Sequence, residues 1–357
     1  MSIKLSLETA KNVLLEADEK RARIDDGTGK TVRSIIKGPH KTYRYVLITA
    51  LLAKAADSRV DILSIQAKDD SAGAYDAREL CHKVIVPFER DNYPMGLGGS
   101  NEPYLNKPAR YPRLSLQNAV RKGQDRKTLE TLIGILKKIA DEGTALKYLS
   151  SAIADIEAVS IEYNSQYQLD SVTFDKNGNA QQILDYIYHV TDDAREGETC
   201  PILVAALEQI YLGNGVEVKA HKVNESGASS KEIGDIDIFN GNDIVYSIEV
   251  KDKDFTKDDV GHAIRKFTDA HLEKSMFIFG KNARWDKCSV LQLVARMGRI
   301  GHYCCVMSIL DFAKIRLMNS PEGTNMKCFS STIMEMAKKI HATEETVNWL
   351  KSNLSKI

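Results

Sequence analysis

Three side chains of types suited to phosphodiester chemistry stand on two neighbouring segments with the alternating pattern of β-strands. The segment IGDIDIF (233–239) carries Asp237, and the segment DIVYSIEVK (243–251) carries Glu249 and Lys251. Side chains alternate between the faces of a strand, so residues two positions apart share one face. Each segment therefore predicts an apolar face towards a core and a charged face opposite it. The Gly-Asn pair between the segments predicts that they form a β-hairpin.

The charged face offers the ligands that Mg²⁺ prefers. This cation takes hard oxygen ligands, usually one or two carboxylates completed by water and substrate phosphate. Asp237 and Glu249 can supply the carboxylates, and Asp235 on the same face is a second candidate ligand. The metal would activate a bound water and neutralise phosphate charge, and Lys251 could stabilise the developing negative charge. We therefore predict a Mg²⁺-dependent site with Asp237, Glu249 and Lys251 as catalytic residues. The alternative is a surface hairpin with an Asp–Lys pair, although Asp is disfavoured in strands.

A second set of polar residues lies in a long irregular stretch, from about residue 91 to residue 123, that is rich in Pro and Gly. Loops of this length in a compact protein are usually functional or disordered. Arg and Asn can pair with base edges in the major groove, and Lys and Arg hold phosphates. We expect the DNA-binding residues to be Asn106, Lys107, Arg110, Arg113, Arg121 and Lys122. The alternative is an exposed basic loop without a ligand.

The elements that position these residues differ between the two halves of the chain. Apolar residues at helical spacing predict helices over 4–23, 40–57, 125–157 and 179–191. A polar segment at 190–198 predicts a boundary, so we expect a mainly helical DNA-recognition region at 1–195 and a catalytic domain at 196–357. In the second region the pattern predicts the order α-β-β-β-α-β-α-β, followed by a mostly helical tail. The fold class is therefore α+β, with a mixed sheet flanked by helices.

The composition sets limits on the function. Hydrophobic residues make up 43% of the chain and charged residues 27%, and 49 basic residues balance 49 acidic ones. Any DNA contact must therefore come from a local basic surface. No apolar run reaches the roughly 18 residues of a membrane span, and the N-terminus lacks signal-peptide features, so we expect a cytoplasmic protein without a membrane partner. The cysteines have no CxxC spacing, which disfavours a zinc site or a disulfide framework.

These features resemble the PD-(D/E)XK nuclease superfamily. The resemblance rests on Asp237, followed twelve residues later by Glu-Val-Lys at 249–251, and on the α-β-β-β-α-β order around them. It implies a PD-(D/E)XK core in which the aspartate and glutamate bind metal and the lysine is catalytic. Many members also place a metal-facing glutamate on the helix before the first strand, and Glu208 matches that position. Ile236 stands where the motif name has proline, which is often absent.

The length and the base-reading residue types resemble type II restriction endonucleases, and the general make-up resembles the SacI-type family, whose site is GAGCTC. The resemblance implies a sequence-specific endonuclease that hydrolyses double-stranded DNA with Mg²⁺. Such enzymes are commonly homodimers, because a two-fold dimer matches a palindromic site, and a cognate DNA methyltransferase is encoded nearby. Two alternatives remain open: a repair or structure-specific nuclease of the same superfamily, and a non-catalytic DNA-binding protein on that scaffold.

Overall fold

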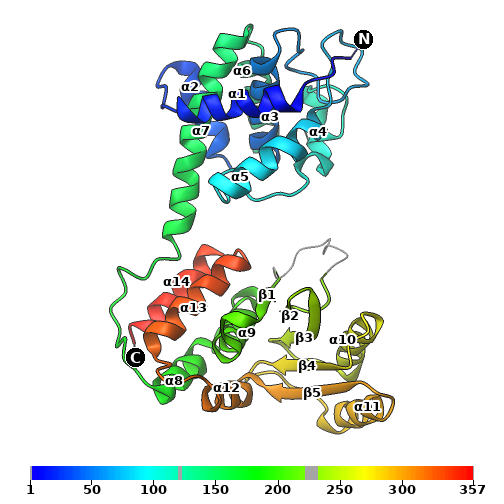
Figure 1. The fold of residues 1–357 in the computed structure, drawn as a ribbon, viewed down its shortest axis with the longest axis vertical. Coiled ribbons are helices and arrows are strands. Elements are labelled where there is room, and N and C mark those ends of the chain that lie inside the picture. Colours follow the sequence, from blue (N-terminus) through cyan, green and yellow to red (C-terminus); the bar gives the residue numbers. More distant parts are fainter. Residues whose placement is uncertain (1, 120–122, 222–231, 357) are drawn as a thin grey trace. The chain divides into compact units, whose positions relative to one another are not determined.

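The chain divides into two compact units, Met1–Ser165 and Gln166–Ile357 (Figure 1). The computed structural model describes residues 2–119, 123–221 and 232–356, and the statements below concern these residues. The division falls before the boundary expected at residue 195, so residues 166–195 group with the second unit. None of the described helices is long and apolar enough to cross a membrane.

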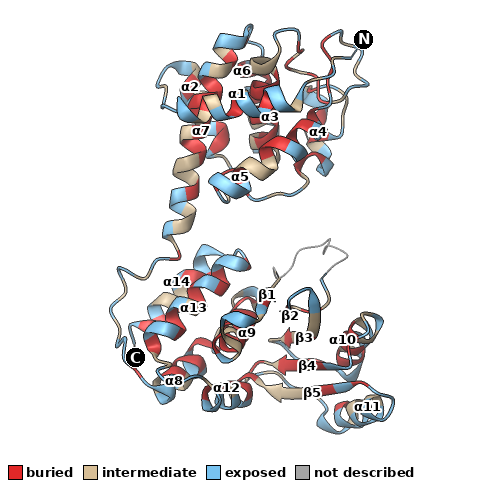
Figure 2. Ribbon diagram, viewed as in Figure 1, coloured by how far each residue is buried: buried red, intermediate tan, exposed pale blue. Residues whose placement is uncertain are grey.

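The first unit is built around two long helices. The buried helix α3 (Lys41–Ala56) packs against α7 (Glu142–Ser165), and α1 (Leu7–Glu19) and α2 (Gly27–Ile36) complete the layer around them. Figure 2 shows buried residues along α3. The shorter helical elements of this unit are α4 (Ala77–Leu80), the π-helical turn Cys81–Ile85, α5 (Val86–Asn92) and α6 (Gln124–Leu136).

Two details of this unit differ from the sequence-based expectation. The Gly- and Asp-rich segment after residue 23 forms α2, because Asp26 caps the helix by accepting a hydrogen bond from the backbone N–H of Gly29 (2.7 Å). The single helix expected over 125–157 is two helices, α6 and α7, separated at residues 137–141. A cap and an interruption are both local features that apolar spacing alone does not reveal.

The irregular stretch after α5 is held by buried polar groups. Glu89 accepts hydrogen bonds from the backbone N–H groups of residues 97–99 at 2.8–3.0 Å. Further along, buried Asn118 forms a capping box with Ser115 and donates to the carbonyl of Pro108 (2.9 Å). The stretch also contains three short 3₁₀ turns, Pro103–Leu105, Lys107–Ala109 and Leu116–Asn118. This segment therefore has a defined backbone course over its described residues.

The second unit contains a five-stranded mixed sheet in the order β1-β2-β3-β4-β5. The strands are β1 (Glu217–Ala220), β2 (Ile236–Asn240), β3 (Asp243–Lys251), β4 (Lys274–Phe279) and β5 (Tyr303–Ser308). The first three strands pair antiparallel and the last three parallel. The α+β class and the predicted order of strands and helices are both confirmed.

Helices cover both faces of this sheet (Figure 1). On one face lie α9 (Thr199–Leu212), which is buried along most of its length, and α12 (Ile309–Met318). On the other lie α10 (Lys257–Asp269) and α11 (Lys287–Arg299), whose apolar residues form a separate core with the side chains of β4 and β5. The α10 face is the one that carries the charged residues of the hairpin, because Glu249 and Phe277 are register partners in β3 and β4.

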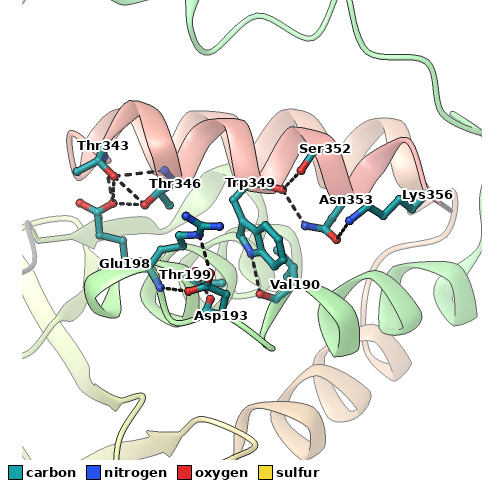
Figure 3. Close-up of polar contacts among 11 residues, drawn as sticks. Val190, Asp193, Glu198, Thr199, Thr343, Thr346, Trp349, Ser352, Asn353 and Lys356 are labelled. Carbon is teal, nitrogen blue, oxygen red and sulfur yellow. Dashed lines mark hydrogen bonds and ion pairs between the residues drawn. The ribbon is translucent and has the colours of Figure 1, made fainter.

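The C-terminal helices explain where the second unit begins. Figure 3 shows α14 (Glu344–Leu354) resting on the segment that joins α8 (Ala180–Val190) to α9. The indole N–H of Trp349 donates to the carbonyl of Val190 (3.0 Å), and the buried carboxylate of Glu198 accepts from Thr343 and Thr346. With α13 (Met326–Lys339), these contacts tie α8 to the end of the chain. Such long-range contacts are invisible in the local composition that suggested a boundary at residue 195.

Candidate active site

The register of the β2–β3 hairpin brings the charged residues to one face of the sheet. Ile236 pairs with Ile248 and Asp237 pairs with Ser247, and both isoleucines are fully buried. By strand alternation Asp237 and Ser247 lie on the opposite face from these isoleucines. Asp235 lies two residues before Asp237, and Glu249 and Lys251 lie two and four residues after Ser247, so alternation puts them on the same face. The predicted set is therefore assembled on one face, next to α10.

The carboxylate of Asp237 is buried and accepts two hydrogen bonds at each oxygen. Oδ1 accepts from the hydroxyl of Ser247 (2.6 Å) and the N–H of Gly234 (3.0 Å). Oδ2 accepts from Nε2 of His221 (2.8 Å) and the N–H of Ile233 (3.1 Å). Burial opposes ionisation, but these donors outweigh it, so the pKa of Asp237 lies below its ordinary value. This arrangement stabilises the hairpin and leaves no oxygen turned towards solvent.

Asp235 has a different environment. It is half-buried, and its Oδ2 accepts a hydrogen bond from the N–H of Val250 (2.8 Å). Burial raises the pKa of Asp235 well above its usual range, and the negative charge of Glu249 raises that pKa further. Two carboxyl groups that repel each other in a partly desolvated position favour a cation between them. Asp235 and Glu249 are therefore an interacting pair of carboxyl groups, and the N–H of Val250 fixes the position of Asp235.

Helix α10 supplies two partners for the residues of β3. The ammonium group of Lys251 lies 3.3 Å from Oδ1 of Asp259, and that of Lys266 lies 3.4 Å from Oε2 of Glu249. Asp259 is also the capping-box residue of α10, and the hydroxyl and N–H of Thr256 donate to it. Asp259 and Lys266 are not among the site residues predicted from the sequence, although both lie on the helix that follows the hairpin.

Glu208 lies on the other face of the sheet. Its side chain accepts from the hydroxyl of Tyr246 (3.3 Å) and from Arg316 (2.7 Å). Tyr246 is the register partner of Ile238 and so shares the apolar face. Burial raises the pKa of Glu208, against the opposing effect of Arg316. The expected role of Glu208 as a metal-facing residue is therefore wrong in this structure, because the sheet separates it from Asp235 and Glu249.

The residues expected to bind DNA lie in the first unit and have different surroundings. Asn106, Lys107 and Arg110 are exposed, and Arg110 donates through Nε to the carbonyl of Leu105. Arg113 instead bridges two acidic side chains, Asp61 at 2.6 Å and Asp69 at 3.0 Å. Its guanidinium therefore already has protein partners. Arg121 and Lys122 lie outside the described residues.

Across residues 2–119, 123–221 and 232–356, no group of three or more His, Cys, Asp or Glu side chains is arranged to hold a metal ion. Apart from the saturated Asp237, the charged face of the hairpin carries the carboxylates of Asp235 and Glu249. One or two carboxylates are the usual protein contribution to a Mg²⁺ site, whereas a structural zinc site takes four protein ligands.

Comparison with known proteins agrees with the division into two units. Residues 5–160 match the SacI restriction endonuclease N-terminal domain, and residues 175–281 match the SacI restriction endonuclease C-terminal domain. The chain is also 27% identical over 261 residues to the type II restriction enzyme SacI of Streptomyces achromogenes, covering 71% of this chain and 70% of that enzyme. The second match includes the β2–β3 hairpin and α10. The chain therefore belongs to the SacI restriction endonuclease family.

Proposed function

We propose that the protein is a type II restriction endonuclease that hydrolyses phosphodiester bonds of double-stranded DNA at a specific sequence with Mg²⁺. The observation that carries this proposal is the placement of Asp235, which accepts a hydrogen bond from the N–H of Val250 (2.8 Å) and so lies beside Glu249 and Lys251. Membership of the SacI family supports it, and so does the similarity to a type II restriction enzyme. The α-β-β-β-α-β order supports a PD-(D/E)XK core.

In this proposal Asp235 and Glu249 hold the metal, and Asp237 positions them. Asp237 is saturated with donors and buried, whereas Asp235 lacks such compensation for its charge. When bound, Mg²⁺ would lower the pKa of a coordinated water and neutralise charge on the scissile phosphate. Hard carboxylate oxygens suit that cation, and water and phosphate oxygens complete its shell.

Lys251 would act on the substrate itself. Its ammonium group points along the charged face and is held there by Asp259. From this position it can hydrogen-bond the attacking water and stabilise negative charge on the phosphate oxygens. The neighbouring Val250 is buried, so the lysine is carried by a strand that cannot shift without disturbing the core.

We propose that the first unit reads the DNA sequence through the exposed side chains of its irregular segment, Asn106, Lys107 and Arg110. Their types suit base edges and phosphates. The enzyme would work in the cytoplasm as a homodimer on a palindromic site, with a cognate methyltransferase protecting host DNA. GAGCTC is the first sequence to test.

The test is digestion of a plasmid that contains GAGCTC, beside the same plasmid with that site altered. We expect discrete fragments with Mg²⁺ or Mn²⁺, binding with little cleavage in Ca²⁺, and no cleavage in EDTA. Sequencing of the fragment ends would give the recognition site and stagger. Cleavage without sequence preference would favour a repair or structure-specific nuclease, and binding without cleavage under all metal conditions would favour a non-catalytic DNA-binding protein.

Matched variants separate the roles of the carboxylates. Asp235→Asn and Glu249→Gln should each abolish cleavage while the protein stays folded. Glu208→Gln serves as the control, because this acid lies on the opposite sheet face beside Arg316. Undiminished cleavage by folded Asp235→Asn and Glu249→Gln proteins would refute the proposed site.

A further inference from the structure

Two ion pairs join β3 to α10, and each pair takes an acid from one element and a base from the other. On β3, the acid Glu249 precedes the base Lys251 by two positions. On α10, the acid Asp259 precedes the base Lys266 by seven positions, which is close to two helical turns and puts both on one side of the helix. Each β3 residue pairs with the opposite charge on α10, at 3.3 and 3.4 Å.

The two lysines of this arrangement are not equivalent. Lys251 pairs with Asp259, whose carboxylate is also committed to the capping box of α10. Lys266 pairs with Glu249, one of the two carboxylates that the proposed function assigns to the metal. The side chain of Lys266 is 39% exposed, so its ammonium group has room to turn. The adjacent Phe267 is fully buried and holds the backbone of Lys266 in place.

We propose that Lys266 is a second phosphate-binding lysine of the site, released from Glu249 when that carboxylate binds metal. This inference rests on the proposed nuclease function. A divalent cation at Glu249 repels an ammonium group whose nitrogen now lies 3.4 Å from the same carboxylate. Lys266 then pairs with the nearest remaining anion, a DNA phosphate at the entrance of the site. In the metal-free protein Lys266 neutralises part of the charge of the carboxylate pair.

An ordinary surface ion pair would behave differently. Exposed pairs contribute little to stability, and removing one would change DNA binding by the same small amount with or without metal. The proposed role instead makes the contribution of Lys266 to DNA binding depend on metal. Arg265, the exposed cation at the preceding position of the same helix, is the matched control.

The experiment measures binding of a short GAGCTC duplex to the full-length protein by fluorescence anisotropy, in EDTA and in Ca²⁺. The proteins are wild type, Lys266→Met and Arg265→Met. We expect Lys266→Met to bind like wild type in EDTA and about tenfold more weakly in Ca²⁺, as for one lost charge-assisted contact. Its salt dependence in Ca²⁺ should fall by about one unit of slope. Arg265→Met should have the same effect under both conditions.

A second measurement does not involve DNA. Calorimetric titration with Ca²⁺ alone should show tighter binding to Lys266→Met than to wild type, because the competing ammonium group is gone. Equal effects of Lys266→Met in EDTA and Ca²⁺, or unchanged Ca²⁺ affinity, would overturn the inference and leave the nuclease assignment standing. If wild type itself neither binds Ca²⁺ nor binds DNA more tightly with it, the proposed metal site and this inference both fail.

Discussion

Replacing Asp235 and Asp237 one at a time should separate catalysis from stability. The two acids are two positions apart on one strand face, yet their surroundings are opposite. Asp237→Asn replaces one carboxylate oxygen by an NH₂ group that faces hydrogen-bond donors. Asp235→Asn removes a charge that Glu249 repels. We therefore expect the first variant to be destabilised, and the second to be as stable as wild type but inactive.

The magnitude follows from the hydrogen bonds. Asp237 accepts from Ser247 (2.6 Å), His221 (2.8 Å) and two backbone N–H groups, and the asparagine can keep only the bonds to one oxygen. Removing the charged member of such a buried cluster costs about 3–5 kcal/mol of unfolding free energy. That is a large part of the total stability of an ordinary domain.

The loss should depend on pH with a defined sign. The donors hold the pKa of folded Asp237 below its ordinary value, which the unfolded chain retains at about 3.9. The stabilising effect of the carboxylate is therefore fully present above that unfolded value and is lost as pH falls through the folded pKa. Wild type and Asp237→Asn should thus differ most in stability at neutral pH and converge in acid.

Thermal unfolding followed by circular dichroism, over a pH series, measures this difference. Calorimetric titration with Ca²⁺ on the same preparations measures metal binding. The reasoning is refuted if Asp237→Asn unfolds like wild type but no longer binds the cation, or if Asp235→Asn binds the cation normally. Either result would return the ligand role to Asp237.

The remaining predictions concern other side chains of the two units. Lys251→Ala should keep the fold and specific DNA binding while single-turnover cleavage falls roughly 100- to 1000-fold, and a wild-type rate would mean that this lysine is only a surface residue. Arg113→Ala should lower the stability of the protein by about 1–2 kcal/mol in chemical denaturation, because it removes a bridge between two acids; unchanged stability would reopen its DNA role. Arg110→Ala should leave unfolding unchanged and weaken specific binding by about 1–3 kcal/mol in gel-shift assays, and equal binding would place recognition elsewhere. Glu208→Gln should reduce stability by about 1–3 kcal/mol without altering Ca²⁺ affinity, whereas a lost metal site would contradict its position.

Local patterns were sufficient to predict the strands and helices around the β2–β3 hairpin in the second unit. Period-two alternation in 233–239 and 243–251, with a Gly-Asn turn between them, predicts a hairpin with one charged face, and the structure has that hairpin. The order of later strands and helices follows from runs such as SMFIFG and YCCVMSI, which are short, apolar and separated by amphipathic segments. These features depend on neighbours in the chain, which the sequence displays directly.

Contacts between distant segments could not be predicted in this way. One of the hydrogen bonds to the carboxylate of Asp237 comes from His221, which directly follows β1. Arg113 is a residue type that commonly contacts DNA. Its guanidinium instead binds Asp61 and Asp69, which are more than forty positions away in the sequence. Glu208 lies on the predicted helix, but on the opposite side of the sheet from Asp235 and Glu249. Local sequence does not show this, because the packing of α9 decides which sheet face Glu208 contacts.

A single bulge in the hairpin decides which residues of β3 lie opposite the two acids. Near the turn Phe239 pairs with Ile244, and the register then shifts so that Ile238 pairs with Tyr246. Without the extra residue, Asp237 would face Tyr246 and Asp235 would face Ile248, so the acids would lie on the apolar side of β3. A one-residue slip exchanges the faces of a strand, and bulges near functional sites commonly redirect side chains in this way. With the bulge, Asp237 lies opposite Ser247, whose hydroxyl donates a hydrogen bond to its carboxylate. Asp235 lies next to Glu249, whose negative charge raises the pKa of Asp235. The residue across the hairpin, rather than the acid itself, therefore separates a carboxylate saturated by hydrogen bonds from the one that we propose as a metal ligand.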